Sequence, residues 1–260
     1  MSVLVTSRPL DEYCGLFGLT RAELGAVPGP VLDCPGGAAG LVAEARTLGC
    51  RAIAADPGYA VPPRELAARA RAGREVMAAA IAADPARHLP RHLRAERYLR
   101  SWDRARRLFA ADAAAHPERY VAAALPQLPF ADGTFALTLS SYLLFAYPDL
   151  FEPRQQLAAL LELVRVTDPA GEVRIHPLHD GTGTRYPWLD ELRAELGRRQ
   201  VASEVRRYGR PTGHRVLVLR AADHRRRAAR TGAGAPGLSA GREPRDPART
   251  GPRRGDRPAR

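Results

Sequence analysis

The order of apolar and polar positions along the chain predicts short strands that alternate with helices. Residues 30–33 and 51–55 are short apolar runs bounded by proline, glycine or aspartate, which is typical of buried strands. Between them, residues 38–48 are rich in alanine and leucine and end at Gly49, a residue that commonly follows a helix. A strand, a loop, a helix and a second strand within roughly 25 residues indicate the start of a parallel sheet.

Helices are also predicted before and after this unit. Thr20 and Glu23 have the spacing of a capping box, so a helix should start at Thr20, and a shorter one is expected around residues 10–17. Residues 62–115 have helical patterning that Pro85 and Pro90 interrupt. In the second half of this region one side of the helix is apolar, and we expect it to pack against the protein rather than bind a ligand. That side consists of Ala95, Tyr98, Leu99, Trp102, Ala105 and Phe109. The other sides carry Arg94, Arg97, Arg100, Arg104, Arg106 and Arg107.

The second half of the chain continues the alternation. Strands are predicted at 120–124, 136–140 and 172–176, and turns at 128–135 and 168–171. Two helices are expected between the strands, the second at 187–199. The first should bury one face, formed by Leu157, Leu160, Leu161 and Val164. Residues 201–208 and 214–220 flank Arg210-Pro-Thr-Gly213, whose turn residues favour an antiparallel hairpin.

Composition and charge divide the chain into a folded part and a tail. The 260 residues are 45% hydrophobic and 26% charged, as in ordinary globular proteins. The net charge of +12 lies in two regions: residues 57–118 hold 12 arginines against seven acids, and residues 223–260 hold 11 against four. The tail has one large aliphatic residue, Leu238, among prolines and glycines, so it is predicted to be disordered. We therefore expect a folded domain over 1–222 with a helical insert at 57–118.

The arginines have two interpretations. The chain contains no lysine, which a GC-rich genome explains without any function. A nucleic-acid-binding arm is the functional interpretation of the tail, but no aromatic side chain interleaves there to stack on bases. We therefore interpret the tail as a solvated extension, and the arginines of the insert as a solvated face.

Several classes of protein are excluded. Three cysteines do not make a disulfide scaffold, and no Cys-x-x-Cys pair indicates a metal site. The apolar runs are too short for a membrane span, and the first residues lack the features of a signal peptide. A cytoplasmic protein without a membrane partner is expected, and the pattern does not predict its oligomeric state.

Residues 33–40 carry the candidate chemistry. A glycine-rich loop between a strand and a helix lets the backbone approach a ligand, with the amides of the helix start facing it. Asp56 ends the next strand, where a carboxylate suits the hydroxyls of a ribose. Asp33 lies inside the strand before the loop, where a carboxylate disfavours a pyrophosphate and favours a cofactor with a cationic or amino-acid end.

With these residues, and with 128–135, 161–166, 168–171 and the closing hairpin, the chain resembles class I S-adenosylmethionine-dependent methyltransferases of the general methyltransferase-domain type. The resemblance covers roughly residues 28–56 and 119–222. It implies a three-layer, Rossmann-like α/β sandwich. Its sheet would have seven mostly parallel strands in the order 3-2-1-4-5-7-6, with the last strand antiparallel and a helical insert after strand 2.

The resemblance also implies S-adenosyl-L-methionine as the cofactor and assigns residues to its parts. The methionine portion would be held by Asp33, Cys34, Pro35, Gly36 and Gly37. The adenosine portion would be held by Asp56 at the ribose and by Pro57, Ala124 and Leu125 around the adenine. Next to the transferred methyl group, after the fourth strand, would lie Ser140, Ser141 and Tyr142.

Methyl transfer from a sulfonium needs positioned reactants, and a base if the nucleophile carries a proton. The catalytic candidates are Tyr142, His176 and His179, with Tyr147 and Asp180 nearby in the sequence. His176 and His179 end the fifth strand, on the side where α/β folds bind ligands. A routine hydrogen-bonded histidine is the alternative for His176, and no metal site is predicted because no further ligand is evident.

Residues 140–143, Ser-Ser-Tyr-Leu, lack the Asn-Pro-Pro-Tyr or Asp-Pro-Pro-Tyr run of amino-group methylation, and no Pro-Cys nucleophile occurs. A small-molecule acceptor is therefore expected, with the insert as a hypothetical lid over it. Three alternatives remain. Pro35 and Ala39 replace usual loop glycines, which fits a methyltransferase-like protein without catalysis. The arginine-rich insert and tail fit a nucleic-acid-associated protein. A nicotinamide oxidoreductase has the weakest support, from two glycines of G-x-G-x-x-G.

Overall fold

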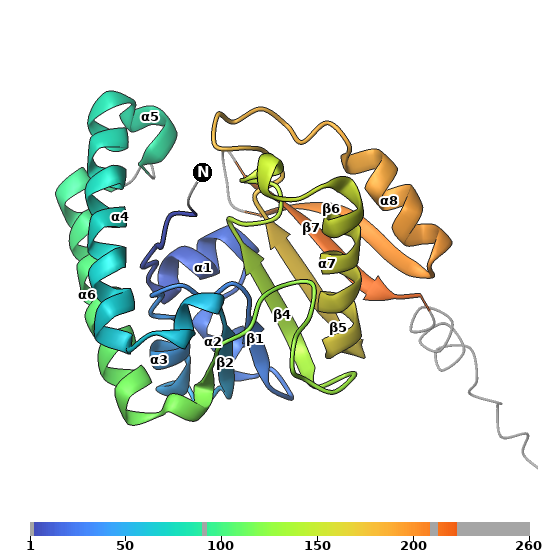
Figure 1. Cartoon of the computed structure of the whole chain (residues 1–260), viewed down its shortest axis with the longest axis horizontal. Helices are drawn as coiled ribbons and strands as arrows, with labels where there is room; N and C mark the ends of the chain where they lie inside the picture. The colour runs from blue at the N-terminus through green and yellow to red at the C-terminus, as the bar shows by residue number, and fades with distance from the viewer. Residues whose placement is uncertain (1–2, 90–92, 209–212, 223–260) are drawn as a thin grey trace, which may run out of the picture.

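The computed structural model describes residues 3–89, 93–208 and 213–222 (Figure 1). Within them, seven strands form one sheet in the order β3-β2-β1-β4-β5-β7-β6. β7 runs antiparallel to β5 and β6, and the other neighbouring pairs are parallel. The predicted order and directions are confirmed. The strands are β1 Val31–Asp33, β2 Ala52–Ala55, β3 Tyr120–Val121, β4 Phe135–Ser141, β5 Thr167–His176, β6 Val201–Tyr208 and β7 His214–Ala221.

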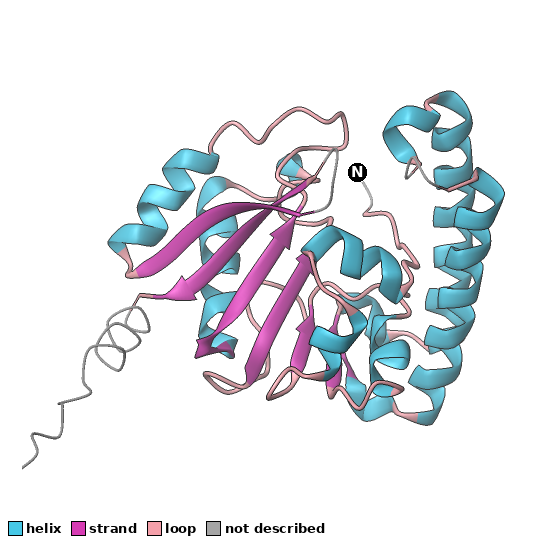
Figure 2. Ribbon diagram, turned by 180° about the vertical axis from the view of Figure 1, so that it is seen from behind, coloured by secondary structure: helices cyan, strands magenta, loops and turns pink. Residues whose placement is uncertain are grey.

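Helices cover both faces of the sheet, so the core has three layers (Figure 2). One face packs against α1 Leu10–Phe17, α2 Arg21–Gly25 and α3 Leu41–Arg46. The other face packs against α7 Pro153–Val166 and α8 Leu189–Arg198. Short 3-10 helices occur at η1 Pro57–Ala60, η2 Pro117–Arg119 and η3 Pro148–Leu150.

The predicted insert forms a helical pair beside the β3 edge of the sheet (Figure 1). α4 Pro63–Ala83 and α6 Ala95–Ala115 lie against each other, with α5 Pro85–His88 between them in sequence. α4 ends just before Pro85, as predicted, whereas Pro90 lies outside the described residues. No helix of the described residues has both the length and the apolar character that a membrane crossing requires.

The apolar stripe of α6 packs against the protein, as expected: Tyr98, Trp102, Ala105 and Phe109 are buried, and Ala95 and Leu99 are partly buried. Its outer part contacts α4 through Trp102 and Tyr98, and its inner part joins the sheet edge through Phe109, which stacks on Tyr59 at 5.9 Å between ring centroids. Arg106 is an exception among the predicted exposed arginines, because its side chain is largely covered and pairs with Asp103. The stripe therefore fixes the insert to the sheet edge.

The capping box at the start of α2 is also confirmed. The Thr20 hydroxyl accepts a hydrogen bond from the Glu23 amide, and the Glu23 carboxylate accepts one from the Thr20 amide at 2.7 Å. Two of the otherwise unpaired amides at the helix start are thereby satisfied.

Two local predictions were only partly correct. The fully buried face of α7 consists of Gln156, Ala159, Leu160, Leu163 and Val166. Of the predicted face, Leu160 is fully buried, whereas Leu157, Leu161 and Val164 are partly buried and pack against the same core. Gln156 misled the pattern because its polar side chain is satisfied inside, donating to the Leu144 carbonyl at 3.0 Å and accepting from Tyr186.

The predicted turn at 168–171 lies inside β5 as a bulge. Phe135 pairs with Thr167, but Leu137 pairs with Glu172. The turn chemistry is present, since the Asp168 carboxylate accepts from the Ala170 amide at 2.7 Å. A Cβ on Gly171 would lie 2.5 Å from the Ala136 carbonyl oxygen, so glycine permits the strands to continue beside each other. The strand predicted at 120–124 is shorter than expected and ends at Val121.

Replacement of Gly73 in α4 by alanine should destabilise the protein by about 1–3 kcal/mol, although alanine is the better helix former. The new Cβ would lie 2.2 Å from the Val5 carbonyl oxygen, so α4 and the N-terminal segment would have to move apart. Gly15→Ala in α1 is the matched control, because nothing lies within 4 Å of its Cβ, and it should stabilise by about 0.5–1 kcal/mol. Urea unfolding measures both. Equal stabilisation by the two substitutions would contradict the contact between Val5 and α4.

Candidate functional site

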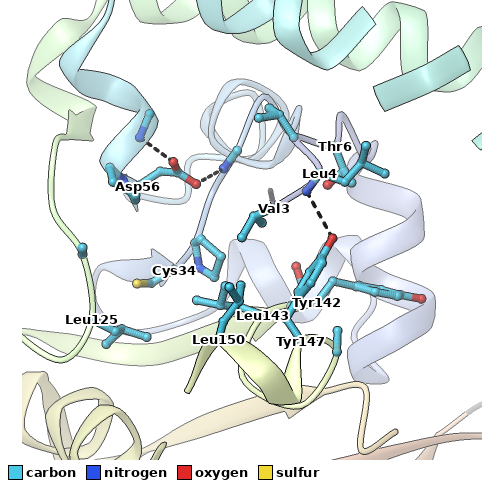
Figure 3. A pocket seen from close by; sticks show the side chains of 18 of the residues that line it. Val3, Leu4, Thr6, Cys34, Asp56, Leu125, Tyr142, Leu143, Tyr147 and Leu150 are labelled. Carbon is cyan, nitrogen blue, oxygen red and sulfur yellow. Dashed lines mark hydrogen bonds between the residues drawn. The ribbon is translucent and has the colours of Figure 1, made fainter. Parts of the chain in front are cut away.

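A cavity of about 580 Å³ lies at the carboxyl ends of β1, β2 and β4 (Figure 3). This is the side of an open α/β sheet where ligands bind, and the volume lies in the range of about 300–1,000 Å³ typical of ligand sites. The predicted cofactor residues that line it are Cys34, Pro35, Gly37, Asp56, Pro57, Ala124, Leu125 and Ser141, and Tyr142 lines it as well.

The Asp56 carboxylate joins the loop after β1 to η1. Its Oδ2 accepts from the Gly37 amide at 2.9 Å and its Oδ1 from the Gly58 amide at 2.7 Å, as the dashed lines in Figure 3 show. Burial raises the pKa of Asp56, and these two hydrogen bonds oppose that effect. Each carboxylate oxygen has a second acceptor position, so the group can also accept hydrogen bonds from hydroxyls of a ligand.

The N-terminal segment, residues 3–9, crosses the start of α3. The Ala38 amide donates to the Thr6 carbonyl at 3.0 Å and the Gly40 amide to the Arg8 carbonyl at 2.9 Å. These amides, which the sequence suggested would face a ligand, are therefore satisfied by the protein itself. The segment also reaches the loop after β4, where the Leu4 amide donates to the Tyr147 hydroxyl at 3.2 Å. It forms one wall of the cavity.

Arg8 is the buried cation of the cavity wall, with 4% of its surface exposed. Its Nε donates to Glu12 at 2.9 Å and its Nη1 to the Thr6 hydroxyl at 2.6 Å. The guanidinium carbon lies 3.8 Å from the centroid of the Tyr142 ring, close enough for a cation–π interaction. Tyr142 follows β4 with a positive φ of 53°, a strained conformation that places its ring beneath Arg8.

Glu12 holds this cluster together. Besides Arg8, it accepts hydrogen bonds from the Tyr98 hydroxyl and the Trp102 indole nitrogen, each at 3.0 Å. The cluster therefore connects the N-terminal segment, α1 and α6 behind the cavity. Sequence reasoning missed Arg8. The only signal for it was the i,i+4 spacing of Arg8 and Glu12, which surface pairs share.

Asp33, Gly36 and Ser140 do not line the cavity. Asp33 has 1% of its surface exposed and accepts from the Tyr13 hydroxyl of α1 at 2.9 Å, while its Oδ1 has no partner among the described residues. Burial raises the pKa of Asp33 to about 8, although the hydrogen bond from Tyr13 opposes this, so the carboxyl is mainly protonated at neutral pH.

The other two lie behind the cavity for local reasons. A Cβ on Gly36 would meet the Tyr59 hydroxyl at 2.3 Å, so glycine is needed where the loop packs on that ring. Ser140 points to the opposite face of the sheet from Ser141 because neighbours on a strand alternate. Cys34 does line the cavity, but burial raises its pKa far above the ordinary range, so its thiol is protonated.

The two candidate histidines lie elsewhere. His176 and His179 line a second cavity of about 250 Å³. The ring of Tyr142, which lines the first cavity, packs edge-on against the His176 ring, with 5.5 Å between the two centroids. The structure therefore brings Tyr142 to the larger cavity and separates the histidines from it. Within the described part of the chain, no group of three histidine, cysteine or acidic side chains is arranged to hold a metal ion.

The insert contributes a side wall through Pro57, Gly58, Leu66 and Arg69. Several of its arginines are paired with acids, including Arg69 with Glu65 and Arg74 with Asp103. A lid function of the insert and a nucleic-acid contact through it both stay predictions, and the tail at 223–260 lies outside the described residues.

No protein-family model matches the chain, and no curated protein matches it. Solved structures do. A 1,6-didemethyltoxoflavin-N1-methyltransferase from Burkholderia thailandensis, with 1,6-didemethyltoxoflavin and S-adenosylhomocysteine bound, is 20% identical with a TM-score of 0.41, over 76% of this chain and 74% of that one. A SAM-dependent methyltransferase from Aquifex aeolicus is 15% identical, over 80% and 90%, with a TM-score of 0.39.

A TehB-like SAM-dependent methyltransferase from Corynebacterium glutamicum is 12% identical, over 82% of this chain and 94% of that one, with a TM-score of 0.41. These scores are low, so the fold assignment rests on the strand order and directions themselves. That arrangement is the one that the resemblance to class I methyltransferases implies: seven strands in the order 3-2-1-4-5-7-6 with the last antiparallel.

Proposed function

We propose that the protein is an S-adenosylmethionine-dependent methyltransferase that acts on a small-molecule acceptor. The observation that supports this most is the cavity at the carboxyl ends of β1, β2 and β4, with the Asp56 carboxylate beside the loop after β1. The adenosine half of the cofactor fits these residues. Asp56 has acceptor positions left for the ribose hydroxyls, and Pro57, Ala124 and Leu125 offer an apolar slot for the adenine.

For the methionine half, Arg8, which lines the cavity, takes the place of the predicted Asp33, which does not line it. A guanidinium fixed by Glu12 and Thr6 is suited to pair with the cofactor carboxylate, because its orientation is set before binding. When bound, the cofactor supplies a methyl group on a positively charged sulfur. The face of the Tyr142 ring beneath Arg8 would lie next to that end of the cavity.

The acceptor would occupy the part of the cavity between the N-terminal segment and the loop after β4. Leu4, Leu143, Leu150 and Phe151 line it and exclude water from the reacting atoms. Tyr142 and Tyr147 also line this part. Burial raises the pKa of Tyr142, although Arg8 opposes this, so its hydroxyl stays protonated at neutral pH and can donate a hydrogen bond that orients the acceptor.

Calorimetric titration of the full chain with S-adenosylmethionine, S-adenosylhomocysteine and NAD tests this function. We expect micromolar binding of both sulfur ligands and none of NAD. Asp56→Asn should weaken binding of the sulfur ligands about tenfold or more, because an amide donor replaces one of the oxygens that accept from the ribose. Asp11→Asn, at an exposed aspartate of α1, is the matched control and should bind normally. Failure of a folded wild-type chain to bind either sulfur ligand would reject the proposal.

A methyltransferase-like protein without catalysis is the second candidate. The N-terminal carbonyls that occupy the Ala38 and Gly40 amides favour it, because these amides are then not free for the cofactor. Such a protein would bind the sulfur ligands weakly or not at all, and it would release no S-adenosylhomocysteine with any acceptor in a screen.

A further inference from the structure

The second cavity brings together three histidines from three segments of the chain. His176 ends β5, His179 follows in the loop after it, and His214 begins β7. The centroid of the His176 ring lies 5.1 Å from that of His214 and 6.3 Å from that of His179, with both neighbours nearly perpendicular to it. His176 is 4% exposed and forms the floor, whereas His214 is exposed at the rim. The methyltransferase proposal uses none of these residues.

The charge of this cavity has one sign. Arg185 and Arg215 line it with the histidines, and its described lining includes no acidic residue. Two carboxylates lie beside the lining. Asp180 accepts from the Thr182 and Thr184 amides of its own loop at 2.8 and 2.9 Å and interacts electrostatically with His179, and Asp190 pairs with Arg185 at 2.9 Å. The described lining itself is therefore basic, with part of the charge of Arg185 balanced by Asp190.

The hydrogen bonds of the rings determine what they can offer a ligand. Nδ1 of His176 donates to the Arg215 carbonyl at 3.1 Å, and Nδ1 of His179 donates to the Asp180 carbonyl at 2.8 Å. These carbonyls fix the tautomer with the proton on Nδ1. Nε2 then becomes a donor only when the ring takes up a second proton, so a ligand that accepts hydrogen bonds there must bind together with protons.

The surroundings oppose that protonation when the cavity holds no anion. Burial lowers the pKa of His176 to about 3, and the charges of His214, His179 and Arg8 add to this effect. Partial burial and His179 lower the pKa of His214. An anion within hydrogen-bond distance would favour the charged form of each ring and raise both pKa values. A transition metal is not favoured, because among the described residues no three ligands are placed for one.

We propose that this second cavity binds an oxyanion group, the phosphate or carboxylate of a small ligand, on the protonated imidazoles of His176 and His214 with Arg185 and Arg215 at its rim. Binding takes up protons, so affinity increases as the pH falls. The cavity of about 250 Å³ has room for such a group and the atoms that join it to a larger molecule. The proposal does not depend on methyl transfer.

Sulfate is the first probe, because its charge is constant between pH 5.5 and 8. Titration into the full chain, with chloride at matched ionic strength as the reference, is followed by the NMR signals of the histidine ring protons. We expect saturable shifts of the His176 and His214 signals and at least tenfold tighter binding at pH 5.5 than at pH 8. Shifts that stay linear in sulfate, or that chloride reproduces, would overturn the proposal.

Variants locate the binding. His214→Gln should weaken sulfate binding at least tenfold while the circular dichroism spectrum is retained, and Arg185→Gln is a second variant at an exposed position. His116→Gln, at a histidine between α6 and η2, is the matched control and should bind as the wild type does. Equal sulfate affinity of all four proteins would place the anion elsewhere. Parallel titrations with inorganic phosphate and acetate distinguish a tetrahedral from a planar oxyanion.

Discussion

Replacement of Glu12 by alanine is expected to lower the free energy of unfolding by about 3–5 kcal/mol, the range for a buried ion pair that loses one partner. The Glu12 side chain is 12% exposed and accepts hydrogen bonds from Arg8, Tyr98 and Trp102. Its loss leaves a buried guanidinium without its counter-charge and two buried donors without acceptors. Because Arg8 borders the larger cavity, the same variant should also lose affinity for S-adenosylhomocysteine.

Glu65→Ala is the matched control for this experiment. Glu65 also pairs with an arginine four residues away, Arg69, but both side chains are about half exposed. Exposed pairs at this spacing contribute about 0.3–0.5 kcal/mol, so the control should change stability by no more than that. Urea unfolding at pH 7, followed by circular dichroism, measures both variants. Similar losses for the two would mean that Glu12 is not buried with its partners.

The second large effect concerns Asp33 and pH. In the folded state burial raises the pKa of Asp33 from its ordinary value of 3.8 to about 8. Between these values the folded state keeps a proton that the unfolded state releases, so unfolding becomes more favourable as the pH rises. The loss of stability approaches about 1.4 kcal/mol per pH unit and stops above the folded-state pKa. Asp33→Asn removes this pH-dependent contribution to stability and keeps an acceptor for the Tyr13 hydroxyl.

Urea unfolding at pH 6 and pH 8 therefore distinguishes the variant from the wild type. The stability of Asp33→Asn relative to the wild type should increase by about 2–3 kcal/mol between the two pH values. Groups other than Asp33 titrate in both proteins and cancel in this difference. Asp149→Asn, at an exposed position in η3, should show no such change. A difference between Asp33→Asn and the wild type that does not vary with pH would show that the wild-type carboxyl is already ionised at pH 6.

The sequence was sufficient for the order of elements because their signals are local. The capping box at Thr20 and the stripe from Tyr98 to Phe109 depend on spacing within one helix, and both were predicted. The position of Asp56 beside the glycine-rich loop followed from the strand–loop–helix–strand order. The face of α7 was not predictable in the same way, because the partners that satisfy buried Gln156 come from distant segments.

The candidate site was predictable only where the backbone determines it. Loop residues such as Gly37 line the cavity because they follow a strand end, whereas Asp33 is closed off by Tyr13 of α1, a contact between segments. Arg8 resembles an ordinary surface arginine in the sequence, since nothing local shows that Glu12, Tyr98 and Trp102 surround it. The ring of Tyr142 packs against His176, and the sequence spacing of these two residues does not predict that contact.

The strand order also has a consequence for how the protein folds. β1 lies between β2 and β4, and Asp33 of β1 pairs in register with Leu139 of β4, more than a hundred residues later. Residues so far apart in the sequence lose much chain entropy when they are brought together, before their contacts compensate for it. Pairings of this kind slow folding. A nascent chain that has not passed β4 has one side of β1 unpaired and lacks the wall that Ser141 and Tyr142 provide. The larger cavity is therefore complete only after β4 has been synthesised and has paired with β1, and ligand binding there reports on the paired sheet rather than on its N-terminal half.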